Sequence, residues 1–158
     1  MKQGATGKAT TNINASPETV YDLVSDVRRM GEWSPECRSC DWIDGATGPA
    51  AGARFKGNNK NGIFRWSTKP TVVVADPGRE FAFVVSHRGQ DQIKWSYRFE
   101  PAPDGTAVTE TFEVLADIPW YFLLGERMMG VKDRRADLEQ GMAETLQRLK
   151  VATEKRAG

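Results

Sequence analysis

Apolar and polar residues alternate with a period of two through the middle of the chain, from residue 36 to residue 115. The clearest example is residues 92–100, where one face would carry Ile93, Trp95, Tyr97 and Phe99. Such alternation predicts strands with one dry face and one wet face. Turn-forming residues at 44–45, 58–62, 76–78, 88–91 and 101–105 divide the region into six strands. The intervals are too short for crossover helices, so we expect an antiparallel meander.

Helical periodicity flanks this meander. Residues 6–14 predict a half-buried first strand, and Ser16 and Pro17 then begin a short helix, because serine caps helices well and proline fits the first helical position. Residues 28–34 form at most a second brief helix. Beyond an irregular aromatic connection at 118–124, residues 127–154 predict a helix about 42 Å long. The pattern therefore predicts one α+β domain over residues 1–158, with seven antiparallel strands and a long C-terminal helix.

Charge and hydropathy exclude several classes of protein. The 22 basic and 21 acidic residues leave a net charge of +1, which argues against a dedicated nucleic-acid binder. The longest apolar stretch, residues 118–124, is far shorter than the roughly 20 residues of a membrane-spanning helix. Residues 1–8 lack the apolar segment of a secretory signal, so we expect a cytoplasmic protein.

Short motifs occur in a characteristic order along nearly the whole chain. They are residues 13–21 (INASPETVY), 30–36 (MGEWSPE), 52–55 (GARF), 77–81 (PGREF), 106–112 (TAVTETF) and 141–150 (GMAETLQRLK). In this order the chain resembles the START-like (SRPBCC) superfamily, specifically its bacterial polyketide cyclase/dehydrase and lipid-transport branch. The resemblance implies a helix-grip fold, in which a curved antiparallel sheet wraps around the C-terminal helix and leaves a hydrophobic cavity. It also implies binding of lipids, polyketides, aromatic compounds or hormones, and catalysis in a minority of members.

Aromatic residues concentrate on the expected inner face of the sheet. They are Phe55, Phe64, Trp66, Phe81, Phe83, Trp95, Tyr97, Phe99 and Phe112. From their positions alone these side chains either fill a solid core or line a ligand cavity. The resemblance favours the cavity, which Met128, Met129 or Val131 of the C-terminal helix would help to close.

Glu110 shares its parity with Val108 and Phe112, so it should point inward. A buried carboxylate needs a partner. We expect a contact with Arg135, or alternatively with Arg134, from the helix that covers the sheet. The pair would either fix the helix on the sheet or orient a polar group of a ligand.

The histidine and the two cysteines are the remaining candidates for chemistry. His87 ends a strand, which predicts a position at the rim of the sheet and permits contact with a ligand at the cavity mouth. Cys37 and Cys40 have the spacing of a redox motif, but in an extended segment they would face opposite sides. We therefore expect reduced structural thiols. A zinc site would need four ligands, which the chain does not offer.

Trp33 and Trp120 fall in segments next to the expected cavity entrance, where they either form a gate or plug the core. Residues 118–124 also suit transient contact with a membrane surface. The complete set of expected ligand-binding residues is Trp33, Phe55, Phe64, Trp66, Phe83, His87, Trp95, Tyr97, Glu110, Phe112, Trp120, Met128, Val131 and Arg135.

The sequence supports three hypotheses of function. The first is binding or transport of a small hydrophobic ligand, without a cofactor or metal. The second is a polyketide cyclase, aromatase or dehydratase, for which the candidate acid–base residues are Glu110, Arg135, Tyr97 and His87. The third is a partner-binding protein that uses the outer face of its sheet. We expect a monomer or a homodimer.

Overall fold

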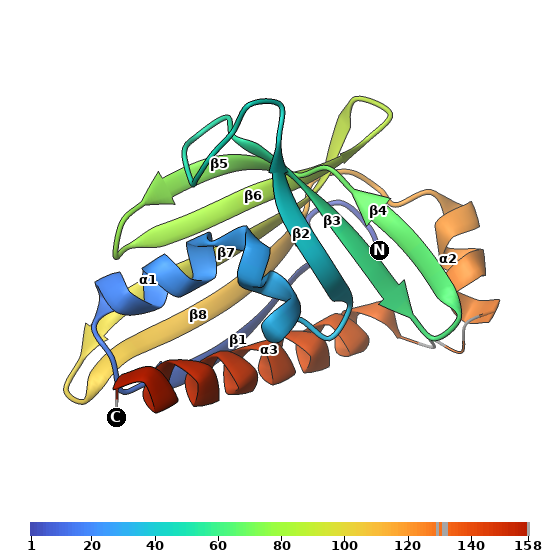
Figure 1. Cartoon of the computed structure of the whole chain (residues 1–158). Helices are drawn as coiled ribbons and strands as arrows, with labels where there is room; N and C mark the ends of the chain where they lie inside the picture. The colour runs from blue at the N-terminus through green and yellow to red at the C-terminus, as the bar shows by residue number, and fades with distance from the viewer. Residues whose placement is uncertain (129, 131–132, 158) are drawn as a thin grey trace.

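The computed structural model describes residues 1–128, 130 and 133–157 (Figure 1). Its strands are β1 (Thr6–Ile13), β2 (Cys37–Ile43), β3 (Arg54–Asn61), β4 (Phe64–Thr68), β5 (Thr71–Asp76), β6 (Glu80–His87), β7 (Gln90–Ala102) and β8 (Gly105–Val114). Its helices are α1 (Pro17–Ser25), the 3₁₀ helix η1 (Val27–Glu32), α2 (Trp120–Met128) and α3 (Arg134–Ala157).

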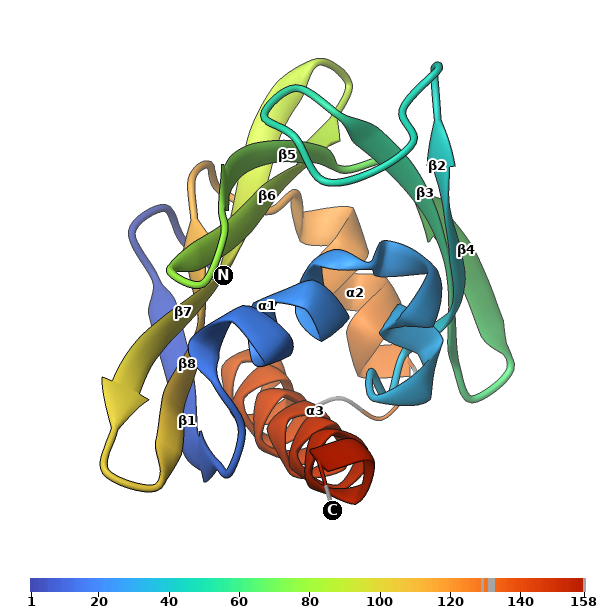
Figure 2. The ribbon, with the colours of Figure 1, turned by 60° about the vertical axis from the view of Figure 1, so that its left-hand side comes forward.

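The strands form one curled antiparallel sheet. Its main path has seven strands in the order β1-β8-β7-β6-β5-β3-β2, and β4 pairs with β3 beside this path. Figure 2 shows the sheet arching around α1 and η1, with α3 lying along the open side of the arch. The predicted helix-grip α+β fold is thus confirmed.

Pro70 explains why the sheet has an eighth strand. The alternation from Phe64 to Val72 predicted a single strand, but the structure divides it into β4 and β5 at residues 69–70. Proline has no N–H to donate to a strand ladder, so it interrupts regular pairing. As a result β4 follows β3, whereas β5 turns to pair with β6.

The C-terminal region holds two helices where one was expected. Part of the aromatic connection forms α2, and α3 begins at Arg134 instead of residue 127. Between them Gly130 has φ of +85°, a left-handed conformation that ends a helix and that glycine adopts without strain. The prediction of one continuous helix was therefore wrong at its first turns.

Both main helices bury the apolar stripes that the sequence predicted. Ser16 caps α1 by accepting a hydrogen bond of 3.2 Å from the backbone N–H of Thr19. The buried apolar side chains include Val20, Leu23 and Val24 of α1 and Val27 of η1, and those of α3 include Leu138, Met142, Leu146 and Leu149. This packing anchors α1 and α3 against the concave face of the sheet.

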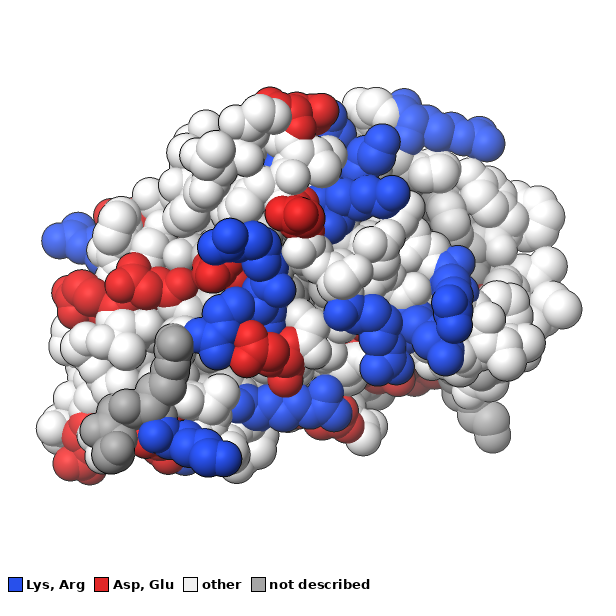
Figure 3. Space-filling model, in the orientation of Figure 1, with Lys and Arg blue, Asp and Glu red and all other residues white. Residues whose placement is uncertain are grey.

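The surface carries both signs of charge. On the face shown in Figure 3, Lys and Arg side chains share the surface with Asp and Glu side chains. Within the described part of the chain, no helix is long and apolar enough to cross a membrane.

Candidate functional site

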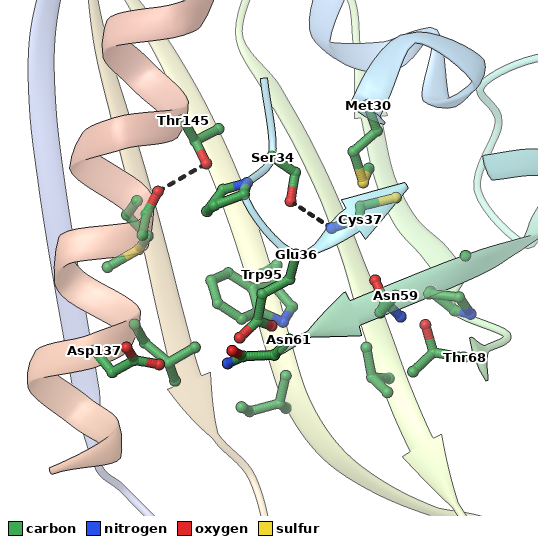
Figure 4. Close-up of a pocket in the computed structure, with 18 of the residues that line it drawn as sticks. Met30, Ser34, Glu36, Cys37, Asn59, Asn61, Thr68, Trp95, Asp137 and Thr145 are labelled. Carbon is green, nitrogen blue, oxygen red and sulfur yellow. Dashed lines mark hydrogen bonds between the residues drawn. The ribbon is translucent and has the colours of Figure 1, made fainter. Parts of the chain in front are cut away.

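A cavity of about 500 Å³ lies between the concave face of the sheet and α3. This volume falls within the range of roughly 300–1,000 Å³ that is typical of small-molecule sites. In Figure 4, Asn59, Asn61 and Thr68 on the sheet stand across the cavity from Asp137 and Thr145 on α3. The segment between η1 and β2 completes the wall, where the Ser34 hydroxyl accepts a 3.1 Å hydrogen bond from the backbone N–H of Cys37.

The aromatic residues on the inner face of the sheet form both a solid core and a cavity wall, the two alternatives that the sequence left open. Five of them line the cavity: Phe55, Trp66, Phe83, Trp95 and Tyr97. Phe81, Phe99 and Phe112 do not line it and are at most 3% exposed. The inner face of the sheet is therefore solid core at some positions and cavity wall at others.

Helix α1 causes this division of the aromatic residues. Its Tyr21 ring packs edge-on against Phe81 and Phe99, with centroid distances of 6.5 and 5.9 Å. Phe112 is covered instead by residues of α3 and by Trp95, at a centroid distance of 5.7 Å. Space remains where neither helix fills the concavity of the sheet.

Polar side chains form a second part of the wall, which our sequence reasoning missed. They include Asn59 and Asn61 on β3, Gln92 on β7 and Thr145 on α3. A signal for the two asparagines was present, because they share the parity of Phe55 along one strand. The cavity is consequently amphipathic rather than uniformly apolar.

Glu110 and Tyr97 form a buried hydrogen-bonded pair in the cavity wall. The two residues are 4% and 5% exposed and lie opposite each other in the β7–β8 register. The Tyr97 hydroxyl donates a 2.9 Å hydrogen bond to Oε1 of Glu110, while Oε2 is buried with no partner among the described residues. Burial raises the pKa of Glu110 to about 8, although the hydrogen bond from Tyr97 acts in the opposite direction. The same burial, together with the neighbouring carboxyl, raises the pKa of Tyr97 well above its usual value.

The predicted contact between Glu110 and Arg135 was wrong. Glu110 does point inward, as its parity predicted, but its partner is Tyr97. The side chain of Arg135 is 58% exposed and lies 3.7 Å from Glu139, one turn along the same helix. Because α3 begins only at Arg134, its apolar stripe does not extend to Arg135, which faces solvent.

Arg134, the alternative partner, instead holds a charged cluster at the rim of the cavity. Its guanidinium lies 2.9 Å from Glu36, 3.1 Å from Glu126 and 2.8 Å from Asp137. All four residues line the cavity and are partly exposed. These carboxylates raise the pKa of Arg134 against the opposing effect of burial, so it stays charged. The cluster joins α2, α3 and the η1–β2 segment, and the basic residues Arg38 and Lys60 line the same cavity.

Comparison with known proteins places this fold and cavity among related molecules. A family model described as polyketide cyclase/dehydrase and lipid transport matches residues 5–154. The chain belongs to this family. A relative of known structure is the Polyketide_cyc-like protein Cgl2372 from Corynebacterium glutamicum, which is 34% identical over 99% of this chain and 96% of its own, with a TM-score of 0.64.

More distant structures share the fold. The di-domain ARO/CYC protein StfQ of the steffimycin biosynthetic pathway matches 97% of this chain and 51% of its own, with 14% identity and a TM-score of 0.75. The protein TTHA0849 from Thermus thermophilus matches 98% of this chain and 100% of its own, with 19% identity and a TM-score of 0.67. A search of the curated proteins found no match.

In this family member the two cysteines occupy the cavity wall together. Cys37 and Cys40 are buried, free thiols, and their Sγ atoms lie 3.0 Å apart. The expectation that they face opposite sides was wrong, because a register shift between Cys37 and Ser39 turns both toward the same face. Hydrogen bonding with Cys40 lowers the pKa of Cys37, whereas the same contact and burial raise the pKa of Cys40.

The other predicted site residues lie outside the cavity wall of this polyketide cyclase/dehydrase family member. His87 ends β6 as expected, and its ring lies edge-on to Phe122 at a centroid distance of 5.1 Å. Trp33 is buried in the core beneath the Arg29 guanidinium, 5.5 Å from its ring centroid. The residues that the structure places on the surface are Phe64, Trp120 and Met128, at 43%, 72% and 79% exposure. Met129 and Val131 lie outside the described residues.

Proposed function

We propose that this protein binds and carries a small hydrophobic ligand, of lipid-like, polyketide or aromatic character, in the cavity between its sheet and α3. The observation that carries this proposal is the space of about 500 Å³ between the sheet and α3, part of whose wall is aromatic. Its volume lies in the range that is typical of small-molecule sites. The family to which the chain belongs supports the same conclusion.

Burial of apolar surface would supply most of the affinity. Phe55, Phe83 and Trp95 contribute apolar surface to the wall from β3, β6 and β7. Burying a ligand against them contributes about 25 cal/mol for each Å² of apolar surface removed from water. The ordered aromatic rings give shape selectivity with little loss of side-chain entropy.

The polar groups of the wall would orient the ligand. The unpartnered Oε2 of Glu110 lies at a buried position, and the carboxyl is protonated at neutral pH because its pKa is about 8. A protonated carboxyl donates a hydrogen bond, which suits a carbonyl or ether oxygen of an uncharged ligand. The preferred ligand therefore has an apolar body and an oxygen acceptor.

A substitution that fills the cavity tests the proposal. Val85 lines the cavity, so Val85→Trp should occupy ligand space. Val73, another strand valine, is 41% exposed and is absent from the wall, so Val73→Trp is the matched control. We expect the wild-type protein and the control to bind 2-acetylnaphthalene in isothermal titration calorimetry, and the cavity-filling variant to bind at least about tenfold more weakly.

Native mass spectrometry of the protein purified from its own host provides a second test. A copurified small molecule that is present in the wild type and missing from Val85→Trp would support the proposal. Equal binding of the naphthyl ketone by both tryptophan variants, or no binding by any of the proteins, would refute a ligand site in this cavity.

The buried Tyr97–Glu110 pair also favours a second candidate, a cyclase, aromatase or dehydratase. A neutral carboxylic acid whose pKa lies near 8 can donate and recover a proton at neutral pH. The structure brings only these two of the four predicted acid–base residues together, because Arg135 and His87 lie away from the cavity wall. Loss of turnover of a polyketide-like substrate in Glu110→Gln with unchanged binding would favour the enzyme, whereas unchanged turnover would exclude this role for Glu110.

The finer statements about the protein's setting stay predictions. They are a cytoplasmic location, a monomeric or homodimeric state and transient contact with a membrane surface through the exposed aromatic side chains of α2. A partner-binding role for the outer face of the sheet is also a prediction.

A further inference from the structure

A β-bulge in β2 changes the relationship between its two cysteines. Cys37 pairs with Asn59 on β3, whereas Cys40 pairs with Gly57, two positions along the same partner strand. Three residues of β2 therefore span two steps of the β3 ladder. Since residues two steps apart on a strand share a face, the bulge places both thiols on the cavity side.

The register of β2 on β3 also gives the spacing along the strand between the positions of Cys37 and Cys40. Two strand steps correspond to about 6.7 Å between the Cα positions, because each residue rises about 3.3–3.4 Å. Disulfides join Cα atoms that are about 4.4–6.8 Å apart. Positions with this spacing fall within the range that a disulfide can bridge.

The side chains already approach each other within this frame. The Sγ atoms of Cys37 and Cys40 are 3.0 Å apart, and both cysteines line the cavity. The partner residue of Cys40 is a glycine, on which a Cβ would lie 3.4 Å from the Cys40 sulfur. A Cβ at this distance would be in ordinary van der Waals contact with the sulfur, so the residue opposite Cys40 places no side chain against it.

We infer that Cys37 and Cys40 form a reversible redox site in the cavity wall, which small hydroperoxides oxidise to an intramolecular disulfide. The Cys37 thiolate attacks one oxygen of hydrogen peroxide, which forms a sulfenic acid and releases the other oxygen as water after protonation. The Cys40 sulfur then displaces the sulfenic hydroxyl, which leaves as a second water when the Cys40 proton is taken up. In total two thiols are oxidised, one S–S bond forms and the peroxide is reduced to two waters.

The directions of the two thiol pKa values favour Cys37 as the residue that reacts first. The hydrogen-bonded contact with Cys40 lowers the pKa of Cys37, and the thiolate is the nucleophilic form of cysteine. The pKa of Cys40 is raised, which suits the residue that reacts second. This site is independent of the ligand proposal, since hydrogen peroxide is small enough to enter an occupied or an empty cavity.

Oxidation of the full-length wild-type protein by hydrogen peroxide tests the inference. We expect the intact mass to fall by two hydrogen atoms and both thiols to become unreactive to N-ethylmaleimide, with the protein unchanged in oligomeric state. Dithiothreitol should restore both thiols. In the folded protein the disulfide should form at least about tenfold faster than in guanidinium, because folding holds the sulfurs together.

Two single substitutions identify the order of the steps. Cys40→Ser should stop at the Cys37 sulfenic acid, which dimedone traps, whereas Cys37→Ser should react with peroxide about tenfold more slowly. Thiols that stay free in the wild type, a disulfide between two molecules, or faster trapping at Cys40 would each overturn the inference. If either variant fails to fold, peptide mapping of the partly oxidised wild type still shows which cysteine is modified first.

Discussion

Glu110 makes the stability of the protein depend on pH in an unusual direction. Burial raises its pKa from 4.5 to about 8 in the folded protein, whereas in the unfolded chain the carboxyl is exposed to water. Between these two pH values the folded state keeps a proton that the unfolded state has lost. The stabilising contribution is therefore fully present below about pH 4.5, and it is lost as the pH rises to about 8. Since each pH unit contributes about 1.4 kcal/mol, the total loss is about 5 kcal/mol.

Guanidinium denaturation of the wild type and of Glu110→Gln measures this effect. The glutamine keeps the shape and can accept the Tyr97 hydrogen bond, but it does not titrate. We expect the variant to gain about 4 kcal/mol relative to the wild type when the pH is raised from about 5 to about 9. Tyr97→Phe removes a hydrogen bond that lowers the pKa of Glu110, so the pH range over which the stability falls should extend to higher pH.

The control is Glu113→Gln, which alters an exposed carboxyl on the same strand. Its stability should follow that of the wild type at every pH. If the curves of the wild type and Glu110→Gln ran parallel across this range, Glu110 would not be held as a neutral acid, and its proposed role as a hydrogen-bond donor to a ligand would be refuted.

Two further predictions concern close packing and the charged rim. Gly7→Ala should lower the free energy of unfolding by about 1–3 kcal/mol in chemical denaturation, because a Cβ there would lie 2.9 Å from Cζ of the buried Phe112. Gly48 has open space around it, so Gly48→Ala should change this free energy by less than about 0.5 kcal/mol. Arg134→Met should destabilise the protein by about 2–3 kcal/mol at neutral pH and by less at about pH 4, where the surrounding carboxylates accept protons. The exposed neighbour Arg135 provides the control, because Arg135→Met should lower the free energy of unfolding by less than about 0.5 kcal/mol. Similar losses of stability in the two variants would contradict the contacts assigned to Arg134.

Alternation of residue types predicted strands such as β8 well because every second residue of that strand from Thr106 to Val114 is buried. The same parity correctly turned Glu110 inward. Its partner could not be predicted in this way, because the position of Arg135 depends on where α3 begins, and Asp133 caps that start by accepting a hydrogen bond from the backbone N–H of Ala136.

The cysteines show a second limit of pattern analysis. Spacing along an ideal strand separates Cys37 from Cys40, but a single extra residue in the β2 ladder reverses the outcome. No residue type in this segment predicts that bulge. In contrast, Asn59 and Asn61 could have been assigned to the cavity from their parity with Phe55, had polar residues been considered as part of the wall.

The break at Pro70 divides the sheet into two units that meet along a short seam. In the described chain the β3–β5 pairing has one register pair, Arg54 with Thr71, whereas the β2–β3 and β5–β6 ladders on either side are longer. Amide hydrogen exchange should accordingly resolve β2, β3 and β4 as a cooperative unit of lower stability than the β6–β7–β8–β1 ladder. Since the first unit holds both cysteines and the asparagine wall, the cavity would open to bulky molecules by local unfolding on one side, while the strand pair that carries Tyr97 and Glu110 stays closed.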